Sequence, residues 1–177
     1  FIPVLGKNGY VIDVDNFIWN KVCACIKMME DKGIEPVPIS VNVSRMHVYQ
    51  EKFTENLKNM AGEYGIDPKY IPLEITESAF TKEEGSLFKK VQSLQGYGFK
   101  FSMDDFGSGY SSLGMLKSER VDEVKIDKTF VDDIATDKGK VLLGNVIRMI
   151  NELGIDMIAE GVETKEQADF LKENGCM

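Results

Sequence analysis

The 177-residue sequence contains few of the residue types on which several common classes of site depend. It has one histidine and three cysteines, which excludes any site that needs two imidazoles and any small disulfide-built fold. Cys23 and Cys25 lie two positions apart on a predicted helix, where their side chains diverge, and we expect reduced, structural thiols in a reducing compartment. His47 follows a predicted strand end in a polar turn, and we expect it at the surface.

Basic residues are outnumbered: 21 Lys and Arg against 29 Asp and Glu give a formal charge of −8. Such a chain has no general attraction for anionic polymers or lipids, so neither nucleic acid nor a membrane surface is expected as a partner. No apolar run approaches the roughly 18 residues that span a bilayer, and no secretory signal is visible. We therefore expect a cytoplasmic protein, or the cytoplasmic domain of a larger, membrane-anchored one.

One pattern recurs along the chain: an amphipathic helix, a glycine, and an apolar residue that leads into a strand. The glycines, which suit a left-handed helix C-terminus, are Gly33, Gly65, Gly98, Gly154 and Gly175. The apolar stripes predicted to be buried are Phe17/Ile18/Val22/Cys25/Ile26/Met29, Phe53/Leu57/Met60/Ala61/Tyr64, Leu87/Val91/Leu94/Tyr97, Leu142/Val146/Ile150/Leu153 and Ala168/Leu171. Strands are predicted at 37–43, 71–75, 100–103, 123–126 and 157–159, with a shorter helix near 112–117.

Alternating helices and strands indicate an α/β fold with a parallel sheet, either an open doubly wound sheet or a (βα)8 barrel. No glycine-rich dinucleotide loop follows a strand, whereas polar residues stand at the C-terminal end of every predicted strand, as on the active face of a barrel. A complete barrel takes about 200 residues or more. We therefore predict that residues 1–177 form a single barrel domain without its first strands and its last strand.

The polar residues at these strand ends are mostly acidic: Asn42, Glu74, Asp104, Asp105, Lys125, Glu160 and Glu163. Carboxylates that converge on one barrel mouth repel each other, and divalent cations relieve that repulsion. Carboxylate and amide oxygens are hard ligands that suit Mg²⁺ or Mn²⁺, and the scarcity of histidine and cysteine argues against zinc.

Asp104 and Asp105 are the most informative pair. Consecutive strand residues face opposite sides, so both reach one site only where the strand ends, and the following sequence 106–109 supplies that ending. Two ions about 3.5–4 Å apart, bridged by a carboxylate, suit in-line attack on phosphorus. Simpler interpretations exist for each residue alone: a strand-to-turn junction here, a turn residue at Asn42, and a surface ion pair of Lys125 with Asp127. Their joint placement on successive strand ends favours a site.

These segments resemble the EAL-domain phosphodiesterases that hydrolyse cyclic di-GMP. The resemblance runs through FIP, SVNVS, LEITES, MDDFGSGYSSL, VKIDKTFV and AEGVET, in the order of that family. It implies a modified (βα)8 TIM-type barrel with one antiparallel strand. It also implies a bacterial signalling enzyme in which activated water attacks one phosphodiester bond and opens cyclic di-GMP to linear pGpG.

The resemblance further implies a set of site residues. Asn42, Glu74 and Asp104 would bind one metal ion, and Asp104 would bridge to a second ion that Asp105 holds. Glu160 corresponds to the acidic residue near the second ion and its waters.

Two further residues acquire roles from the resemblance. Lys125 matches the lysine that orients or deprotonates the attacking water, although a cation there would equally stabilise charge on the phosphorane. Glu163 resembles the glutamate that anchors the loop after Asp105, about Ser108–Ser112. A homodimer through this loop and the adjacent helices is expected.

The sequence also departs from the family pattern. The glutamate of the Glu-Ala-Leu motif, the substrate-binding arginine after it and a Gln-Gly segment expected beyond Met177 have no counterpart, and Gly6 stands where an acid is common. We expect the parent protein to be competent and this segment alone to be impaired. Two other functions stay open: a family receptor that binds cyclic di-GMP without hydrolysing it, and a Mg²⁺-dependent barrel lyase or isomerase with Lys125 as base.

Overall fold

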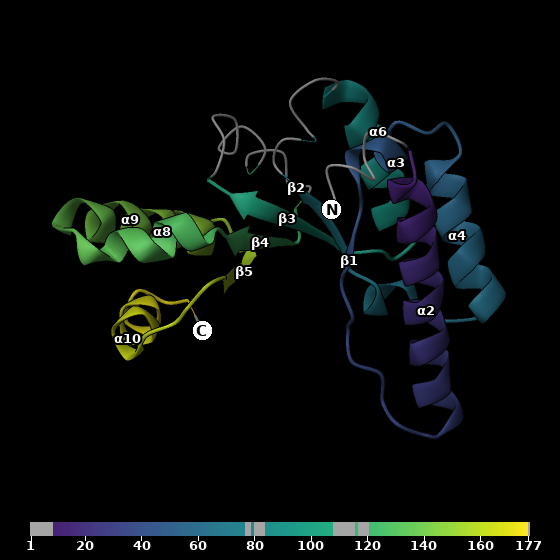
Figure 1. The fold of residues 1–177 in the computed structure, drawn as a ribbon, viewed down its shortest axis with the longest axis horizontal. Helices are drawn as coiled ribbons and strands as arrows, with labels where there is room; N and C mark the ends of the chain where they lie inside the picture. The colour runs from purple at the N-terminus through teal and green to yellow at the C-terminus, as the bar shows by residue number, and fades with distance from the viewer. Residues whose placement is uncertain (1–8, 77–78, 80–83, 108–115, 117–120, 177) are drawn as a thin grey trace. The chain divides into compact units, whose positions relative to one another are not determined.

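The computed structural model describes residues 9–76, 79, 84–107, 116 and 121–176 (Figure 1). It comprises two compact units. The first unit is formed by residues 1–75 and 82–101, and the second unit by residues 76–81 and 102–177. We describe each unit by itself.

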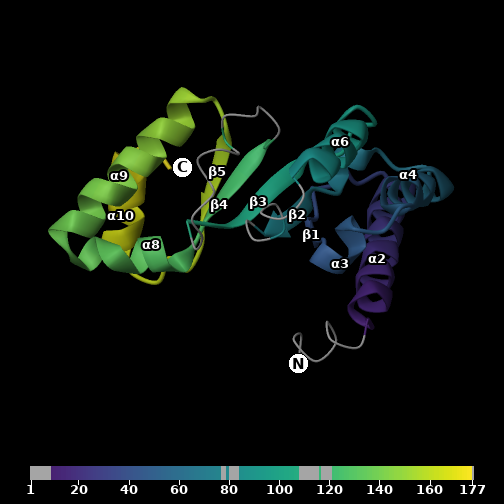
Figure 2. The same ribbon diagram turned by 90° about the horizontal axis from the view of Figure 1, so that it is seen from above.

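The first unit contains two short parallel strands and several helices. Its elements are α2 (Val11–Asp31), β1 (Val41–Asn42), α3 (Arg45–Val48), α4 (Phe53–Tyr64), η1 (Pro68–Tyr70), β2 (Leu73–Thr76) and α6 (Glu84–Gln95). Val41 pairs with Leu73 and Asn42 with Glu74. Helices α2 and α4 lie side by side in both ribbon views (Figures 1 and 2).

The second unit continues the alternation of strands and helices. Its elements are β3 (Phe101–Phe106), β4 (Glu123–Ile126), α8 (Lys128–Asp132), η2 (Asp133–Ala135), α9 (Asp137–Glu152), β5 (Asp156–Ala159) and α10 (Lys165–Glu173). Parallel ladders join β3 to β4 and β4 to β5. In Figure 2, α8, α9 and α10 lie beside β4 and β5.

Most sequence-predicted elements are confirmed, and the differences have local causes. All five glycines predicted to end helices have positive φ. Strand β1 is much shorter than the predicted 37–43, because Pro36 and Pro38 carry no amide hydrogen for a ladder. The helix predicted near 112–117 falls outside the described residues except at position 116.

Two of the predicted buried faces are wrong. Helix α2 buries Asp15, Trp19, Cys23 and Ile26; of the predicted stripe only Ile26 is among these residues, and Phe17 is 63% exposed. Helix α9 buries Leu143 and Ile147 in place of Leu142 and Val146, and of that predicted stripe only Ile150 is buried. Both helices carry two neighbouring apolar stripes, and the tertiary packing selects one of them.

The three cysteines are unpaired, as predicted, and Cys23 and Cys176 are buried. Burial raises the pKa of Cys23 to about 11, which keeps it a thiol and suits a structural role. Within the described parts of the chain, no helix combines the length and the apolar character that crossing a bilayer requires.

Strand β3 contains an irregularity at the paired aspartates. The strand was predicted to end there, but it continues to Phe106, with a register shift between Met103 and Phe106. Asp105 has φ +56°, a left-handed conformation that costs a non-glycine residue free energy and is concentrated at functional sites. This bulge, rather than the end of the strand, breaks the alternation of side chains at Asp104 and Asp105.

Gly107, directly after β3, is expected to tolerate no side chain. Its φ is +96°, and a Cβ atom there would lie 1.8 Å from the ring of Phe130. We expect Gly107→Ala to lower the free energy of unfolding by roughly 2–4 kcal/mol, since overpacking and backbone strain act together. Urea unfolding of the protein measures this change.

Gly154→Ala is the matched control for that substitution. Gly154 has φ +68°, and a Cβ atom added there would have no other atom within 4 Å, so only the backbone cost of about 1–2 kcal/mol applies. Equal losses in the two variants would show that the Phe130 ring does not restrict Gly107.

Candidate functional site

Three charged side chains meet at neighbouring strand ends of the second unit. Lys125, on β4, lies with its Nζ atom 3.3 Å from Asp104 Oδ1 and 2.5 Å from Glu160 Oε1. Asp104 comes from β3, and Glu160 directly follows β5. The side chains of Lys125 and Asp104 are each 15% exposed, so solvent screens this pair less than a surface pair. The sequence neighbours of Lys125 in β4, Val124 and Ile126, are buried, because successive side chains of a strand point to opposite faces.

One carboxylate oxygen of this cluster lacks a hydrogen bond. Asp104 Oδ1 is shielded from solvent and accepts none from the described residues, although the Lys125 ammonium lies within ion-pair distance of it. The ion pair with Lys125 offsets only part of the desolvation cost of this buried oxygen. A cation ligated by this oxygen would remove that cost, so Asp104 fits the role of a metal ligand.

Asp105 lies near other negatively charged side chains. Burial, followed by the charges of Asp104, Asp127 and Glu160, raises the pKa of Asp105, and Lys125 opposes this shift. A carboxylate whose ionised form is disfavoured in the protein alone gains the most from a nearby divalent cation. Asp105 therefore also fits a metal site.

The raised pKa of Asp105 makes the stability of the folded protein depend on pH in a defined direction. The folded state binds more protons than the unfolded state between the ordinary and the raised pKa of Asp105, so its contribution to stability is lost as pH rises through that interval. We expect Asp105→Asn to raise the thermal midpoint of the metal-free protein at pH 7, with a smaller gain at pH 5. Asparagine also tolerates the left-handed backbone there.

Thermal unfolding at both pH values, in the presence of a chelator, tests this expectation. Asp169→Asn, an exposed position on α10, is the control and should leave the midpoint unchanged. A lower midpoint for Asp105→Asn at pH 7 would contradict the assigned repulsion.

Glu163 makes an ion pair that was not predicted from the sequence. Its carboxylate is 2.8 Å from Lys128 on α8, and its backbone amide donates to Gln167. Gly161 lets this segment pass close to Lys128, because a Cβ atom there would lie 2.5 Å from Lys128 Cγ. Thr164 caps α10, in a capping box with Gln167. The loop that Glu163 was predicted to anchor lies outside the described residues, so that role stays a prediction.

Asp127 does not serve mainly as a surface partner of Lys125. Its carboxylate accepts from the Thr129 amide and hydroxyl and so caps α8, while Lys125 contacts Asp104 and Glu160. The simpler interpretation of Lys125 and Asp127 as a surface ion pair is therefore not what the structure favours.

The first unit brings Asn42 and Glu74 together. These residues are register partners on β1 and β2, and the Val43 amide donates to the Glu74 carbonyl at 2.8 Å. The Glu74 side chain is buried, whereas Asn42 is exposed. The predicted residues thus form two groups: this pair in the first unit, and Asp104, Asp105, Lys125 and Glu160 in the second.

His47 was predicted at the surface, and this is wrong. It is 1% exposed, and its Nδ1 atom lies 3.1 Å from Asp15 Oδ2. The Trp19 ring stacks on the imidazole, with 4.4 Å between the two ring centroids. Burial is tolerated because Asp15, 32 positions earlier, supplies a partner. One feature of the sequence could have indicated that His47 is buried: Asp15 and Trp19 share a helix face that is otherwise apolar.

The oxygen donors fit a hard divalent cation by chemical type. Among the described residues, no three acidic, histidine or cysteine side chains have the geometry of a formed metal site. In the second unit, the ammonium of Lys125 contacts two of the predicted acidic residues. A cation that binds these carboxylates therefore competes with Lys125.

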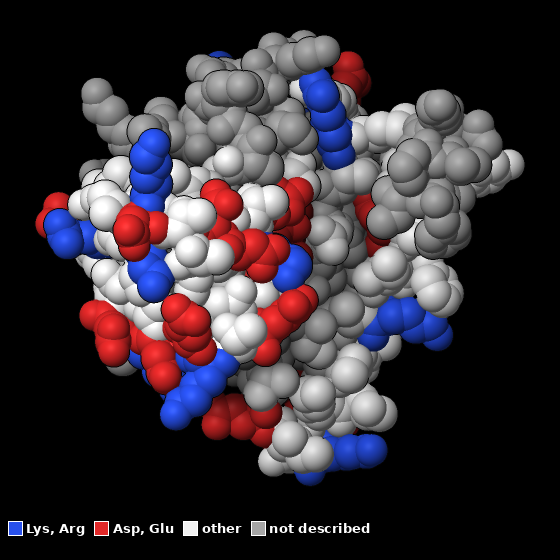
Figure 3. All heavy atoms as spheres, turned by 60° about the vertical axis from the view of Figure 1, so that its left-hand side comes forward, with Lys and Arg blue, Asp and Glu red and all other residues white. Residues whose placement is uncertain are grey.

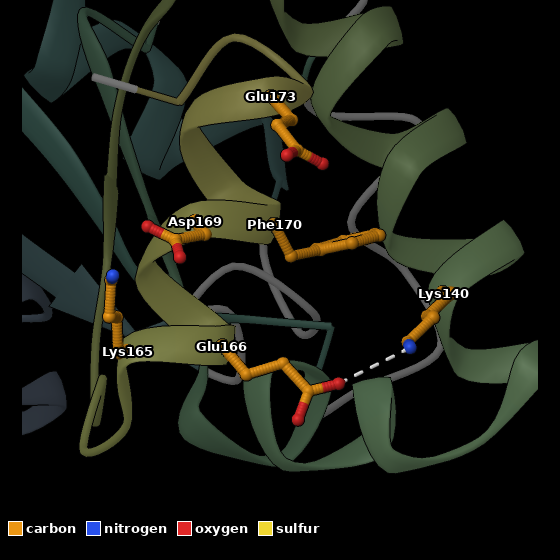
Figure 4. A pocket seen from close by; sticks show the side chains of 6 residues that line it. All are labelled: Lys140, Lys165, Glu166, Asp169, Phe170 and Glu173. Atoms are coloured by element: carbon orange, nitrogen blue, oxygen red, sulfur yellow. Dashed lines mark hydrogen bonds and ion pairs between the residues drawn. The ribbon is translucent and has the colours of Figure 1, made fainter.

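An open hollow between α9 and α10 is separate from the predicted residues. Its lining is Lys140, Lys165, Glu166, Asp169, Phe170 and Glu173, and Lys140 pairs with Glu166 (Figure 4). On the face seen in Figure 3, acidic and basic side chains are interspersed, with no broad basic patch among the described residues.

Comparison with known families decides the identity of the fold. A family model described as "EAL domain" matches residues 1–177, the whole chain. The chain belongs to the EAL domain family. The signaling protein YkoW of Bacillus subtilis is 34% identical over 177 residues, which are 99% of this chain and 22% of that protein. The probable cyclic di-GMP phosphodiesterase PdeG of Escherichia coli is 32% identical over 98% of this chain and 34% of its own length.

The EAL chain spans about a fifth to a third of the length of the curated relatives it matches. Among solved structures, the PaMucR phosphodiesterase in complex with c-di-GMP is 29% identical, with a TM-score of 0.91 over 99% of this chain and 72% of that one. The FimX EAL domain has a TM-score of 0.92 over 100% of this chain and 71% of that one; at 19% identity it supports the fold alone. EAL domains have a TIM-barrel-like fold, so the predicted α/β class is confirmed.

Proposed function

We propose that this EAL domain hydrolyses cyclic di-GMP to linear pGpG, with two divalent cations, Mg²⁺ or Mn²⁺, as cofactors. The observation that carries the proposal is the cluster of Asp104, Lys125 and Glu160, with Asp105 beside it. Relatives at 32% and 29% identity are named as cyclic di-GMP phosphodiesterases, which supports the same reaction here.

In this proposal the cations would be held by the oxygen ligands that the family resemblance implies. Asn42 and Glu74, register partners on β1 and β2, would be two of these ligands, and Asp104, Asp105 and Glu160 would be the others. Asp104, whose buried Oδ1 accepts no hydrogen bond from the described residues, would be a ligand of both ions. When bound, the two ions lower the pKa of water and neutralise phosphate charge.

Lys125 contributes a fixed positive charge. Its ammonium is oriented by Asp104 and Glu160 and donates to the attacking water or to a phosphate oxygen. The water oxygen forms a bond to phosphorus and loses a proton, the bond from phosphorus to the 3′ oxygen breaks, and that oxygen takes up a proton, so one water molecule is consumed overall. A preorganised cation favours this step because negative charge grows on the phosphoryl oxygens.

Turnover of cyclic di-GMP with Mn²⁺, followed by chromatography, tests the proposal. We expect pGpG from the full-length protein, and no pGpG after a chelator has removed its metal ions or after the substitution Asp105→Asn. Binding of cyclic di-GMP without any product would favour a receptor of the same family. Activity on a 2-hydroxy or keto acid instead would favour the barrel lyase or isomerase.

We also propose a homodimer that forms through the loop after Asp105 and the adjacent helices, and a cytoplasmic location. The loop residues 108–115 lie outside the described part of the chain, so the dimer rests on the family resemblance. Light scattering of the purified protein measures its mass in solution, and a monomer at micromolar concentration would contradict the dimer.

A further inference from the structure

Helix α2 contacts the end of β1 at two points one helical turn apart. The indole Nε1–H of Trp19 donates to the backbone carbonyl of Asn42 at 3.0 Å. The carboxylate of Asp15 accepts from the backbone amide of Ser44 at 3.2 Å. Asp15 and Trp19 stand at positions i and i+4 of the helix and therefore share one face.

Both anchoring side chains are held in place by burial and by further contacts. Trp19 is 2% exposed, and Asp15 is 7% exposed. The ring of His47 stacks on Trp19 with an interplanar angle of 30°, and its Nδ1 atom contacts the same Asp15 oxygen that Ser44 uses. An anchor with so little freedom fixes the position of the backbone that it contacts.

The segment around Asn42 is thus fixed from two directions. On one side the Val43 amide bonds to the Glu74 carbonyl of β2, and on the other the Asn42 carbonyl bonds to α2. The side chain of Asn42 itself is exposed and therefore accessible to a ligand.

We propose that Trp19 and Asp15 are positioning residues for Asn42, which they hold so that its amide oxygen meets a divalent cation in a fixed orientation. This inference rests on the proposed function, in which Asn42 is a cation ligand. Neither Trp19 nor Asp15 touches the cation. They act through the backbone, as outer-shell partners that orient ligands do at metal sites.

Mn²⁺ binding to the full protein, without nucleotide, tests the inference through the loss of the spectroscopic signal of free Mn²⁺. Trp19→Phe keeps an aromatic ring and removes the indole donor. We expect the Mn²⁺ dissociation constant to rise about tenfold, the lower end of outer-shell effects. The Mn²⁺ concentration that half-activates hydrolysis should rise equally, while turnover at saturating Mn²⁺ stays within about threefold.

Phe53→Leu is the matched control. Phe53 is fully buried, and its ring centroid lies 6.4 Å from that of Trp19 and 6.2 Å from that of His47. This substitution therefore disturbs the same aromatic cluster but keeps the indole donor. We expect it to lower the thermal midpoint with Mn²⁺ affinity unchanged. If Phe53→Leu weakens Mn²⁺ binding as much as Trp19→Phe, packing rather than the hydrogen bond is responsible, and the inference is overturned.

A second pair of variants tests the Asp15 anchor. Asp15→Asn keeps an oxygen acceptor for the Ser44 amide and should retain wild-type Mn²⁺ affinity, whereas Asp15→Ala should lose affinity several-fold. If the wild type binds Mn²⁺ and hydrolyses cyclic di-GMP but all of these variants bind equally well, the positioning role alone is wrong. If the wild type binds no Mn²⁺, the proposed function is wrong, and the positioning role falls with it.

Discussion

Replacing Asp104 by asparagine is expected to lower hydrolysis of cyclic di-GMP at least about 1,000-fold, a loss of roughly 4 kcal/mol of transition-state stabilisation. The substitution keeps the shape of the side chain and removes its charge. Its buried Oδ1, which accepts no hydrogen bond from the described residues, would no longer be anionic. Mn²⁺ affinity should fall with the rate, because Asp104 is proposed to serve both ions.

Asp169→Asn is the control for this substitution, since it removes one negative charge from an exposed position on α10. We expect the Asp104→Asn protein to stay folded. The substitution weakens the ion pair with Lys125, but it also relieves the repulsion between Asp104 and Asp105, so the two effects on stability oppose each other. Turnover within tenfold of wild type at saturating Mn²⁺ would rule Asp104 out as a shared ligand.

Lys125→Met is expected to lower turnover by about 100- to 1,000-fold while leaving Mn²⁺ binding intact or tighter. Methionine has a similar length without the charge. The ammonium contacts Asp104 and Glu160, two proposed ligands, so its removal frees both carboxylates for a cation. Turnover and Mn²⁺ affinity should thus change independently, and measuring both in one preparation tests this.

Lys125→Arg separates the two roles that the sequence left open for this residue. A guanidinium stays charged and does not accept a proton from water at ordinary pH. A fixed-cation role predicts at least about ten times the activity of Lys125→Met. If the arginine and methionine variants are equally slow, Lys125 acts as the base instead.

Local features of the fold were predictable because local chemistry decides them. A left-handed helix end favours glycine whatever lies nearby, and all five predicted glycines have positive φ. The cap at Thr164 is also decided locally, because its side chain accepts a hydrogen bond from the Gln167 amide three residues later. Strand ends at Glu74, Lys125 and Glu160 followed from short apolar runs, and the structure places these residues in or directly after β2, β4 and β5.

Features that depend on distant partners were not predictable. The burial of His47 requires Asp15, and the face that α2 buries depends on Trp19 stacking against that imidazole. The bulge in β3 places a non-glycine residue, Asp105, at positive φ, against its intrinsic preference. Such a conformation arises only when surrounding structure imposes it, so sequence propensity predicted a plain strand end.

The candidate site residues also differ in whether their contacts could be predicted from the sequence. Residue types and order sufficed to nominate Asp104, Lys125 and Glu160, and Lys125 does contact both of these carboxylates. The partner of Glu163 was missed, because Lys128 precedes it by 35 positions and reaches it only through the close approach at Gly161.

The stacking of Trp19 on His47 also gives the protein an optical reporter. Trp19 is the only tryptophan of the 177 residues, so indole emission from this chain originates in the first unit alone. Unfolding of that unit changes the emission, whereas backbone circular dichroism follows the helices of both units. Coincident midpoints for the two probes would mean that the units unfold as one cooperative block, and separate midpoints would measure the stability of each.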